Sequence, residues 1–234
     1  MGSPIGRGNS LGYDPNIETY LEVGKKRTFA GVLDWPGWCR SGKTKEEALA
    51  ALLEYGPRYE KVLNSASLGF KPPTDLKAFK VVEELDGDAT TDFGAPGMAP
   101  KADGKPVSEQ ELKQLASVLK ACWKALDAAD KKARGKRLTT GPRGGGRARE
   151  DIVRHVLEAE GGYLSRLGWK VGEGKGDETT RTRTAVVDAL TAAAHGEVEE
   201  EGPRGGKRWT ARYFTRRVAW HALDHAWEIE DRVD

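Results

Sequence analysis

The chain has 234 residues, 38% of them hydrophobic, which is enough for two modest domains that each bury a core. No apolar run approaches the roughly 20 residues of a membrane helix, and the N-terminus lacks the basic-then-apolar pattern of a secretory signal. A formal net charge of +2 does not indicate a strongly basic protein, and two isolated cysteines argue against a disulfide scaffold. We therefore expect a cytoplasmic globular protein that is not inserted in a membrane.

Residues 1–16 are rich in Gly, Pro, Ser and Asn, and this composition predicts a disordered tail. Two segments with alternating apolar residues follow, at 19–23 and 27–33. The short turn between them favours a β-hairpin.

Thr44 and Glu47 have the spacing of a helix capping box, and apolar residues at helical spacing follow as far as Val62. A strand-like segment comes next, at 77–85. Together these elements predict a small α+β domain with β-β-α-β order over residues 17–90.

The stretch FAGVLDWPGWCRSGKTKEEALAALLEY resembles the HicB antitoxin family in its strand, its Pro-Gly turn and its helix start. The resemblance covers residues 17 to about 90 and implies a partial ribonuclease-H-like fold. Trp38 precedes the cysteine and no DNA-binding ribbon or helix-turn-helix follows, so we carry over only a module for protein recognition or dimerisation. Residues 35–37 are interpreted as a tight corner between strand and loop, not as a catalytic motif.

A segment rich in Gly, Pro and Ala, 91–107, is predicted to link two domains. Ser108 and Glu111 then form a second capping box, which begins a helix that extends to about residue 133. Between residues 131 and 149 there are eight Lys or Arg and no acidic residue, which indicates a cationic loop or a solvated connector.

Helical periodicity predicts three more helices, at about 148–167, 184–194 and 209–232. A long glycine-rich connection, 169–178, separates the first two of these. Four helices imply an all-α four-helix bundle over residues 108–234.

Three of the four histidines can be placed at one level of this bundle. His221 and His225 lie four residues apart, so they share a helix face. His155 lies roughly 10 Å into its own helix, a depth that matches the pair if the two helices run antiparallel. Antiparallel histidine-bearing helices require an up-down-down-up bundle. In that bundle the connection 169–178 has to span the length of the helices, and it is long enough to do so. The pattern predicts a three-histidine site for a divalent transition metal.

The segments AREDIVRHVLEAEGGYLSRLG and RVAWHALDHAWEIEDR resemble the DinB (YfiT-like) family of four-helix bundles, over residues 108–234. The resemblance implies zinc or nickel bound by His155, His221 and His225. It also implies a small-molecule substrate, and chemistry that uses a low-molecular-weight thiol such as mycothiol or bacillithiol.

Other charged residues are candidates for supporting roles. Glu158, Asp224 and Glu228 lie close enough in sequence to the histidines to orient an imidazole or act as a general base, although ordinary surface pairing is the alternative for each. Around the mouth of the site we expect the arginines of the cationic loop and of the next helix to bind an anionic thiol cofactor. These are Arg143, Arg147, Arg149, Arg181 and Arg183.

The sequence therefore favours a metal-dependent transferase or hydrolase, in which the metal activates a bound thiol or water. The alternative is a non-enzymatic partner-binding or regulatory protein, in which a HicB-like module is fused to a metal-binding helical bundle. Nucleic-acid binding by the cationic loop is disfavoured, because no aromatic residues are interleaved for stacking.

Overall fold

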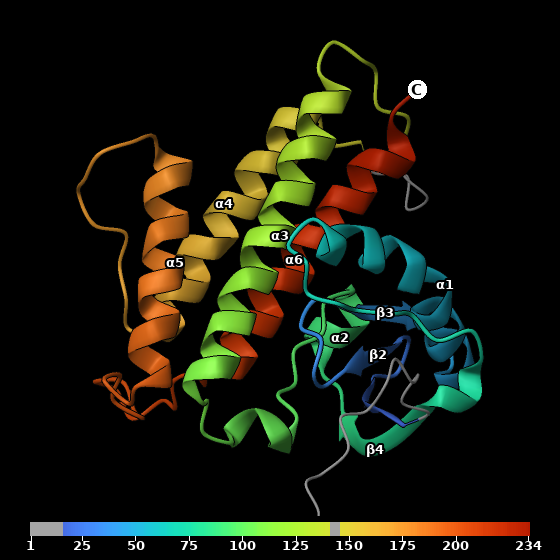
Figure 1. Cartoon of the computed structure of the whole chain (residues 1–234), viewed down its shortest axis with the longest axis horizontal. Helices are drawn as coiled ribbons and strands as arrows, with labels where there is room; N and C mark the ends of the chain where they lie inside the picture. The colour runs from blue at the N-terminus through green and yellow to red at the C-terminus, as the bar shows by residue number, and fades with distance from the viewer. Residues whose placement is uncertain (1–15, 141–145) are drawn as a thin grey trace, which may run out of the picture.

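The structure is a computed structural model that describes residues 16–140 and 146–234. A small mixed sheet with one long helix comes first, and a group of long helices follows (Figure 1). This order confirms the prediction of an α+β unit followed by a helical region. The predicted tail, 1–16, lies outside the described residues except for Asn16.

The sheet contains the strands β1 (Ile17–Val23), β2 (Thr28–Val32), β3 (Cys39–Gly42) and β4 (Phe79–Asp86), in the spatial order β3-β2-β1-β4. The predicted hairpin forms as the antiparallel pair β1–β2, and β4 adds to β1 in parallel. The predicted β-β-α-β order was wrong in one respect, because β3 was missed. This strand is only four residues long and has no apolar alternation, so it carries no sequence signal of its own.

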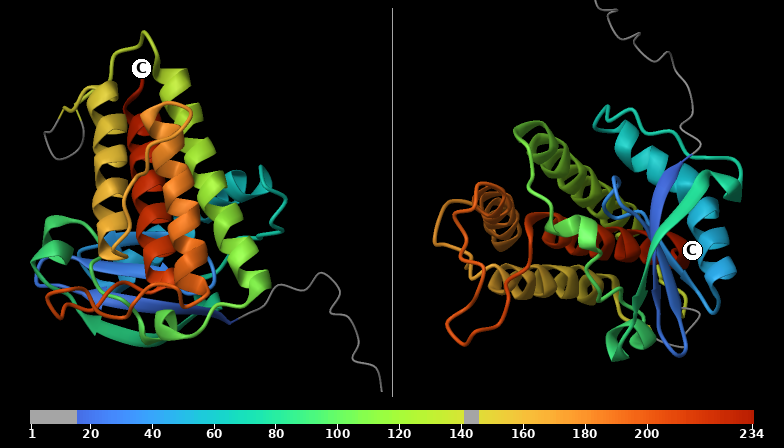
Figure 2. Two further views of the ribbon diagram at one scale, coloured as in Figure 1. Left: turned by 90° about the vertical axis from the view of Figure 1, so that its left-hand side faces the viewer. Right: turned by 90° about the horizontal axis from the view of Figure 1, so that it is seen from below.

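Helix α1 (Lys45–Asn64) begins at the predicted cap, where the Thr44 side chain accepts a hydrogen bond from the Glu47 amide at 3.2 Å. Figure 2 shows α1 on one face of the sheet and the last helix, α6 (Ala211–Arg232), on the other. Strand β2 is consequently buried at every position. On the α6 side, the ring of Phe29 meets that of Trp220 edge-on at 6.1 Å.

The helical region consists of α3 (Glu109–Ala133), α4 (Arg149–Arg166), α5 (Glu178–Ala194) and α6. Helices α3 and α6 run in one direction and α4 and α5 in the other (Figures 1 and 2). Helix α5 begins six residues before the predicted start at Thr184, because the Asp177 side chain caps it by accepting a hydrogen bond from the Thr180 amide at 2.8 Å. Among the described residues, no helix is both long and apolar enough to cross a membrane.

The segment predicted to be a linker, 91–107, is held against the sheet and α6. It contains the end of α2 (Ala89–Phe93) and a short 3-10 helix, η2 (Lys101–Gly104); another such turn, η1 (Leu76–Ala78), precedes β4. The buried carboxylate of Glu22 accepts hydrogen bonds from the amides of Gly97 and Met98 at 2.8 and 3.0 Å. These contacts give the segment a fixed path between the sheet and α3.

The sheet and the helices share one core around α6, which buries 17 of its 22 residues and is therefore enclosed on nearly all sides. The corner at residues 35–38 packs directly on this helix. Gly37 adopts a φ of 93°, and a Cβ built there would lie 3.1 Å from the Cβ of Ala219, so only glycine fits. Trp38 is fully buried beside it and donates to the Leu52 carbonyl at 2.9 Å. The corner is thus a structural feature.

A buried ion pair joins α6 to the segment 91–107. The Arg216 guanidinium donates to both carboxylate oxygens of Asp103, at 2.9 and 2.7 Å, and Asp103 is only 1% exposed. The same guanidinium donates to the carbonyls of Val32 and Leu33 at 2.7 and 3.1 Å. One side chain therefore connects α6, η2 and the end of β2.

We expect Arg216→Met to lower the free energy of unfolding by about 3–5 kcal/mol, because the Asp103 carboxylate would stay buried without its counter-charge. Urea denaturation measures this change. The double variant Arg216→Met, Asp103→Leu should recover part of the loss, since no buried charge remains. A single variant as stable as the wild type would show that the pair is not required.

A second buried acid lies between α3, α4 and α5. Glu160 is 2% exposed, and its carboxyl accepts a hydrogen bond from the Trp123 indole at 2.6 Å. Burial raises the pKa of Glu160 to about 7, against the opposing effects of the Trp123 hydrogen bond and the Arg183 charge. The folded protein therefore holds a proton there at pH values where the unfolded chain has lost it.

The raised pKa of Glu160 determines the direction in which the stability of the protein changes with pH. Stability should fall as pH rises from the unfolded pKa near 4.3 through the folded pKa of about 7, and the full penalty is about 4 kcal/mol. Glu160→Gln keeps an acceptor for Trp123 but has no charge, so between pH 5 and pH 8 the variant should lack the loss of stability that ionisation of Glu160 causes in the wild type. Denaturation curves at the two pH values test this, and an unchanged difference would contradict it.

Candidate metal centre

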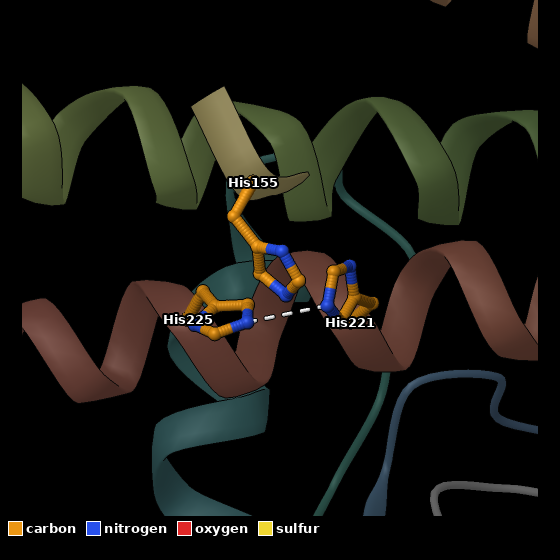
Figure 3. Close-up of side chains that lie close together, drawn as sticks. All are labelled: His155, His221 and His225. Atoms are coloured by element: carbon orange, nitrogen blue, oxygen red, sulfur yellow. Dashed lines mark hydrogen bonds between the residues drawn. The ribbon is translucent and has the colours of Figure 1, made fainter. Parts of the chain in front are cut away.

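Two helices bring three histidines together. His221 and His225 share one face of α6, and the antiparallel α4 places His155 level with them (Figure 3). The three side chains offer nitrogen atoms that all lie within 4.8 Å of one another. The rings stand nearly edge to face, with centroids 4.6–5.1 Å apart. The three predicted ligands therefore form a group that can hold a metal ion.

The spacing of the α6 pair suits a shared ion. The Nε2 atoms of His221 and His225 lie 3.2 Å apart. Two zinc–nitrogen bonds of about 2.0–2.1 Å at a tetrahedral angle place the two nitrogens roughly 3.3–3.4 Å apart. The pair is thus close to the separation that binding requires, so little rearrangement is needed.

Glu228 fixes the orientation of one imidazole. Its Oε2 lies 2.7 Å from Nδ1 of His225, and its Oε1 accepts a hydrogen bond from Arg232 at 2.5 Å. The hydrogen bond from His225 lowers the pKa of Glu228, with Arg232 contributing and burial opposing, so this carboxylate is ionised and accepts a hydrogen bond from the Nδ1–H of His225. Nε2 of His225 then presents its lone pair to the centre of the site.

The other two predicted acceptors lie elsewhere. Glu158 is exposed and its nearest partner is Arg154, at 3.7 Å. Asp224 pairs with Arg40 at 3.0 Å and so ties α6 to β3. Of the three carboxylates considered from the sequence, only Glu228 contacts a histidine of the site.

Burial favours the neutral form of two of the three imidazoles, those of His155 and His221. His221 and His225 are 6% and 9% exposed, and Nδ1 of His221 has no hydrogen-bond partner among the described residues. Burial lowers the pKa of His221 well below its usual value, and the positive charges of neighbouring groups lower it further. Burial likewise lowers the pKa of His155. Neutral imidazole is the form that ligates a metal, so protons do not compete for these nitrogens near pH 7.

Two of the arginines predicted to surround the mouth are paired within the chain. Arg183 donates to both carboxylate oxygens of Asp127 at 2.7 Å. Arg149 contacts Asp130 and Glu150. Their charges are therefore largely compensated by the chain itself.

The remaining three predicted arginines differ from one another. Arg181 donates to the Gly176 carbonyl at 2.7 Å, and Arg143 lies outside the described residues. Arg147 is exposed, and its carbonyl accepts a hydrogen bond from Arg232 at 3.0 Å. The positive charge of Arg147 contributes to the lowered pKa values of His155 and His221, which places it near the site.

Two neighbours of the site were not predicted. Tyr163 projects from α4, and its ring lies 5.8 Å from that of His221. Arg217 is buried on α6 and donates a hydrogen bond to the Tyr163 hydroxyl at 3.3 Å. The spacing of Arg217 one turn before His221 was the only sequence signal for this neighbourhood.

Comparisons of the chain with protein-family models, curated proteins and solved structures found no match. The resemblances to the HicB and DinB families therefore stay predictions. The evidence for the metal centre is the geometry of the three histidines and their hydrogen bonds.

We expect the protein to bind about one divalent ion per chain, and His221→Ala to abolish binding, because two imidazoles alone make an incomplete site. Elemental analysis after equilibration with zinc and gel filtration measures the content. His195→Ala is the matched control, since the His195 ring is exposed at the end of α5 and bonds to Glu109 at 2.8 Å. Equal metal content in the two variants would rule out the three-histidine site.

Proposed function

We propose that the chain is a metal-dependent transferase or hydrolase whose metal, zinc or nickel, is held by His155, His221 and His225. The observation that carries the proposal is the meeting of three imidazole ligands with no fourth protein ligand among the described residues. Catalytic zinc sites usually have three protein ligands and one exchangeable position, whereas structural sites are usually closed by four. Three protein ligands would thus leave one position on the ion for a small molecule.

The helical region is proposed to be an up-down-down-up four-helix bundle of the DinB type. The running directions of α3 to α6 support this, as does the long connection between the parallel helices α4 and α5. In such a bundle the ligands come from facing antiparallel helices, which keeps their spacing rigid.

A bound divalent ion would lower the pKa of a coordinated thiol or water and so supply a nucleophile near neutral pH. The residues around the ion would orient its ligands and leave a route to it. His225 is oriented by Glu228, and Arg232 holds Glu228 in turn. His155 is the least buried of the three ligands, so the route for a substrate leads past α4.

The thiol-transfer reaction is tested with the zinc-loaded protein, a thiol and an electrophilic aryl chloride, by following the aryl thioether product. We expect turnover that a chelator abolishes and zinc restores, because the metal generates the thiolate. His221→Ala should lose this turnover and His195→Ala should retain it. An ester substrate tests the hydrolase option in the same way.

Full metal occupancy without turnover of either substrate would count against the enzyme and favour the alternative. In that case the chain would be a partner-binding or regulatory protein whose metal is structural. The HicB-like sheet would then be the recognition module.

A further inference from the structure

Arg232, the last residue of α6, is a buried arginine that donates hydrogen bonds in three directions. It is only 4% exposed. Its Nη1 donates to Oε1 of Glu228 at 2.5 Å, its Nε to the Thr139 carbonyl at 2.8 Å and its Nη2 to the Arg147 carbonyl at 3.0 Å. Each guanidinium nitrogen has its own acceptor, so the planar group is held in one orientation.

The carboxylate acceptor connects Arg232 to the metal ligands on α6. Oε2 of Glu228 lies 2.7 Å from Nδ1 of His225. Arg232 and His225 therefore contact opposite oxygens of one carboxylate, which fixes the rotation of the carboxylate as well as its position. An acceptor fixed in this way is what orients a ligating imidazole toward its ion.

The Arg147 carbonyl connects the same guanidinium to α4, the helix that carries His155. Arg147 directly precedes Ala148, the N-cap residue of α4, which makes no side-chain cap. The other long helices, α1, α3, α5 and α6, each have a Thr, Ser or Asp side chain as their cap. Arg149 attaches the first turn of α4 to α3, whereas Arg232 attaches the residue before it to α6.

The third acceptor fixes the backbone from which the guanidinium projects. The Thr139 amide donates to the Arg232 carbonyl at 2.8 Å, so these two residues are bonded through both backbone and side chain. The next residues on either side, Leu138 and Val233, form an antiparallel β-bridge. The end of α6 is therefore anchored independently of Glu228, and the guanidinium is a rigid connection between the two helices.

We propose that Arg232 is a positioning residue that holds the two halves of the metal centre in register. It joins the start of α4, and so His155, to the carboxylate that orients His225. This inference rests on the proposed metal centre and adds to it the connection between its two helices. A site held ready in the absence of the ion binds more tightly, because less order has to be created when the ion arrives.

The first test is the zinc affinity of the full chain, measured by competition with a chromophoric chelator. We expect Arg232→Gln to bind zinc at least about 10-fold more weakly than the wild type, the usual effect of losing a residue that supports a metal ligand. Arg232→Lys keeps the charge beside Glu228, but a single ammonium does not reproduce the planar fork that reaches all three acceptors. It should therefore also bind zinc more weakly than the wild type.

Arg58→Gln is the matched control. Arg58 reaches the same last turn of α6 from α1, and it pairs with Glu230 and Asp231 at 2.6 and 2.8 Å. The control variant loses two ion pairs at the end of α6, but it leaves the contacts of Arg232 intact. It should keep the zinc affinity of the wild type.

Hydrogen exchange of the zinc-free proteins tests the connection to α4 without any metal. Amides 152–156 lie in the first turns of α4, ahead of and beyond His155. They should exchange faster in Arg232→Gln than in the wild type, because the start of the helix is no longer tied to α6. Arg58→Gln should leave their exchange unchanged.

The inference and the metal centre fail in different ways. Wild-type zinc affinity in Arg232→Gln or in Arg232→Lys would overturn the role of Arg232 alone. An equal loss of affinity in Arg58→Gln would also overturn it, because general loosening of the end of α6 would then be the cause. Unchanged exchange of amides 152–156 in Arg232→Gln would overturn the connection to α4. A wild type that binds no zinc would overturn the metal centre itself, and with it the proposed function.

Discussion

Helix α6 is enclosed by the sheet on one side and by other helices on the other, so each polar group that it buries has to find its partner inside the protein. Arg216 and Arg232 pair with carboxylates, and the carboxylate that pairs with Arg232 also contacts His225. Nδ1 of His221 has no hydrogen-bond partner among the described residues, and Arg217 donates only to neutral acceptors. The incompletely compensated groups thus lie together, on the stretch of α6 that faces α4. A protein core tolerates such groups at a cost, which a ligand that supplies the missing partners would recover.

The sheet unit supports this helix and does not contribute a metal ligand. Gly37 brings the chain into contact with Ala219, and Arg40 reaches Asp224 beside His225. Arg40 also lies 3.9 Å from the ring centre of Tyr55, so a cation–π contact holds it between α1 and α6. His221 and His225 therefore lie on a helix that both halves of the chain hold in place, as a preorganised site requires.

Sequence periodicity and helix geometry were sufficient to place the histidines. The four-residue spacing determines which face of the helix a residue lies on, and the rise of about 1.5 Å per residue determines how far along the helix it lies. The same reasoning missed β3, whose pairing is set by its neighbour β2, and the early start of α5, which depends on the cap at Asp177. The composition of 91–107 also gave no sign that this segment supplies an acceptor for Arg216, at Asp103, and one for Arg217, at Pro96. Such long-range polar contacts leave no periodic signal. Glu228 was recognisable as a candidate, but only its contact with His225 separates it from Asp224.

The shared helix also fixes the spacing of two of these groups. Arg217 and His221 are separated by four residues, which advance about 6 Å along a helix axis. Because both positions lie on one rigid element, the separation of their backbones does not depend on how α4 is placed. Tyr163 approaches both from α4, and its hydroxyl accepts a hydrogen bond from Arg217, so its own proton remains available to another acceptor.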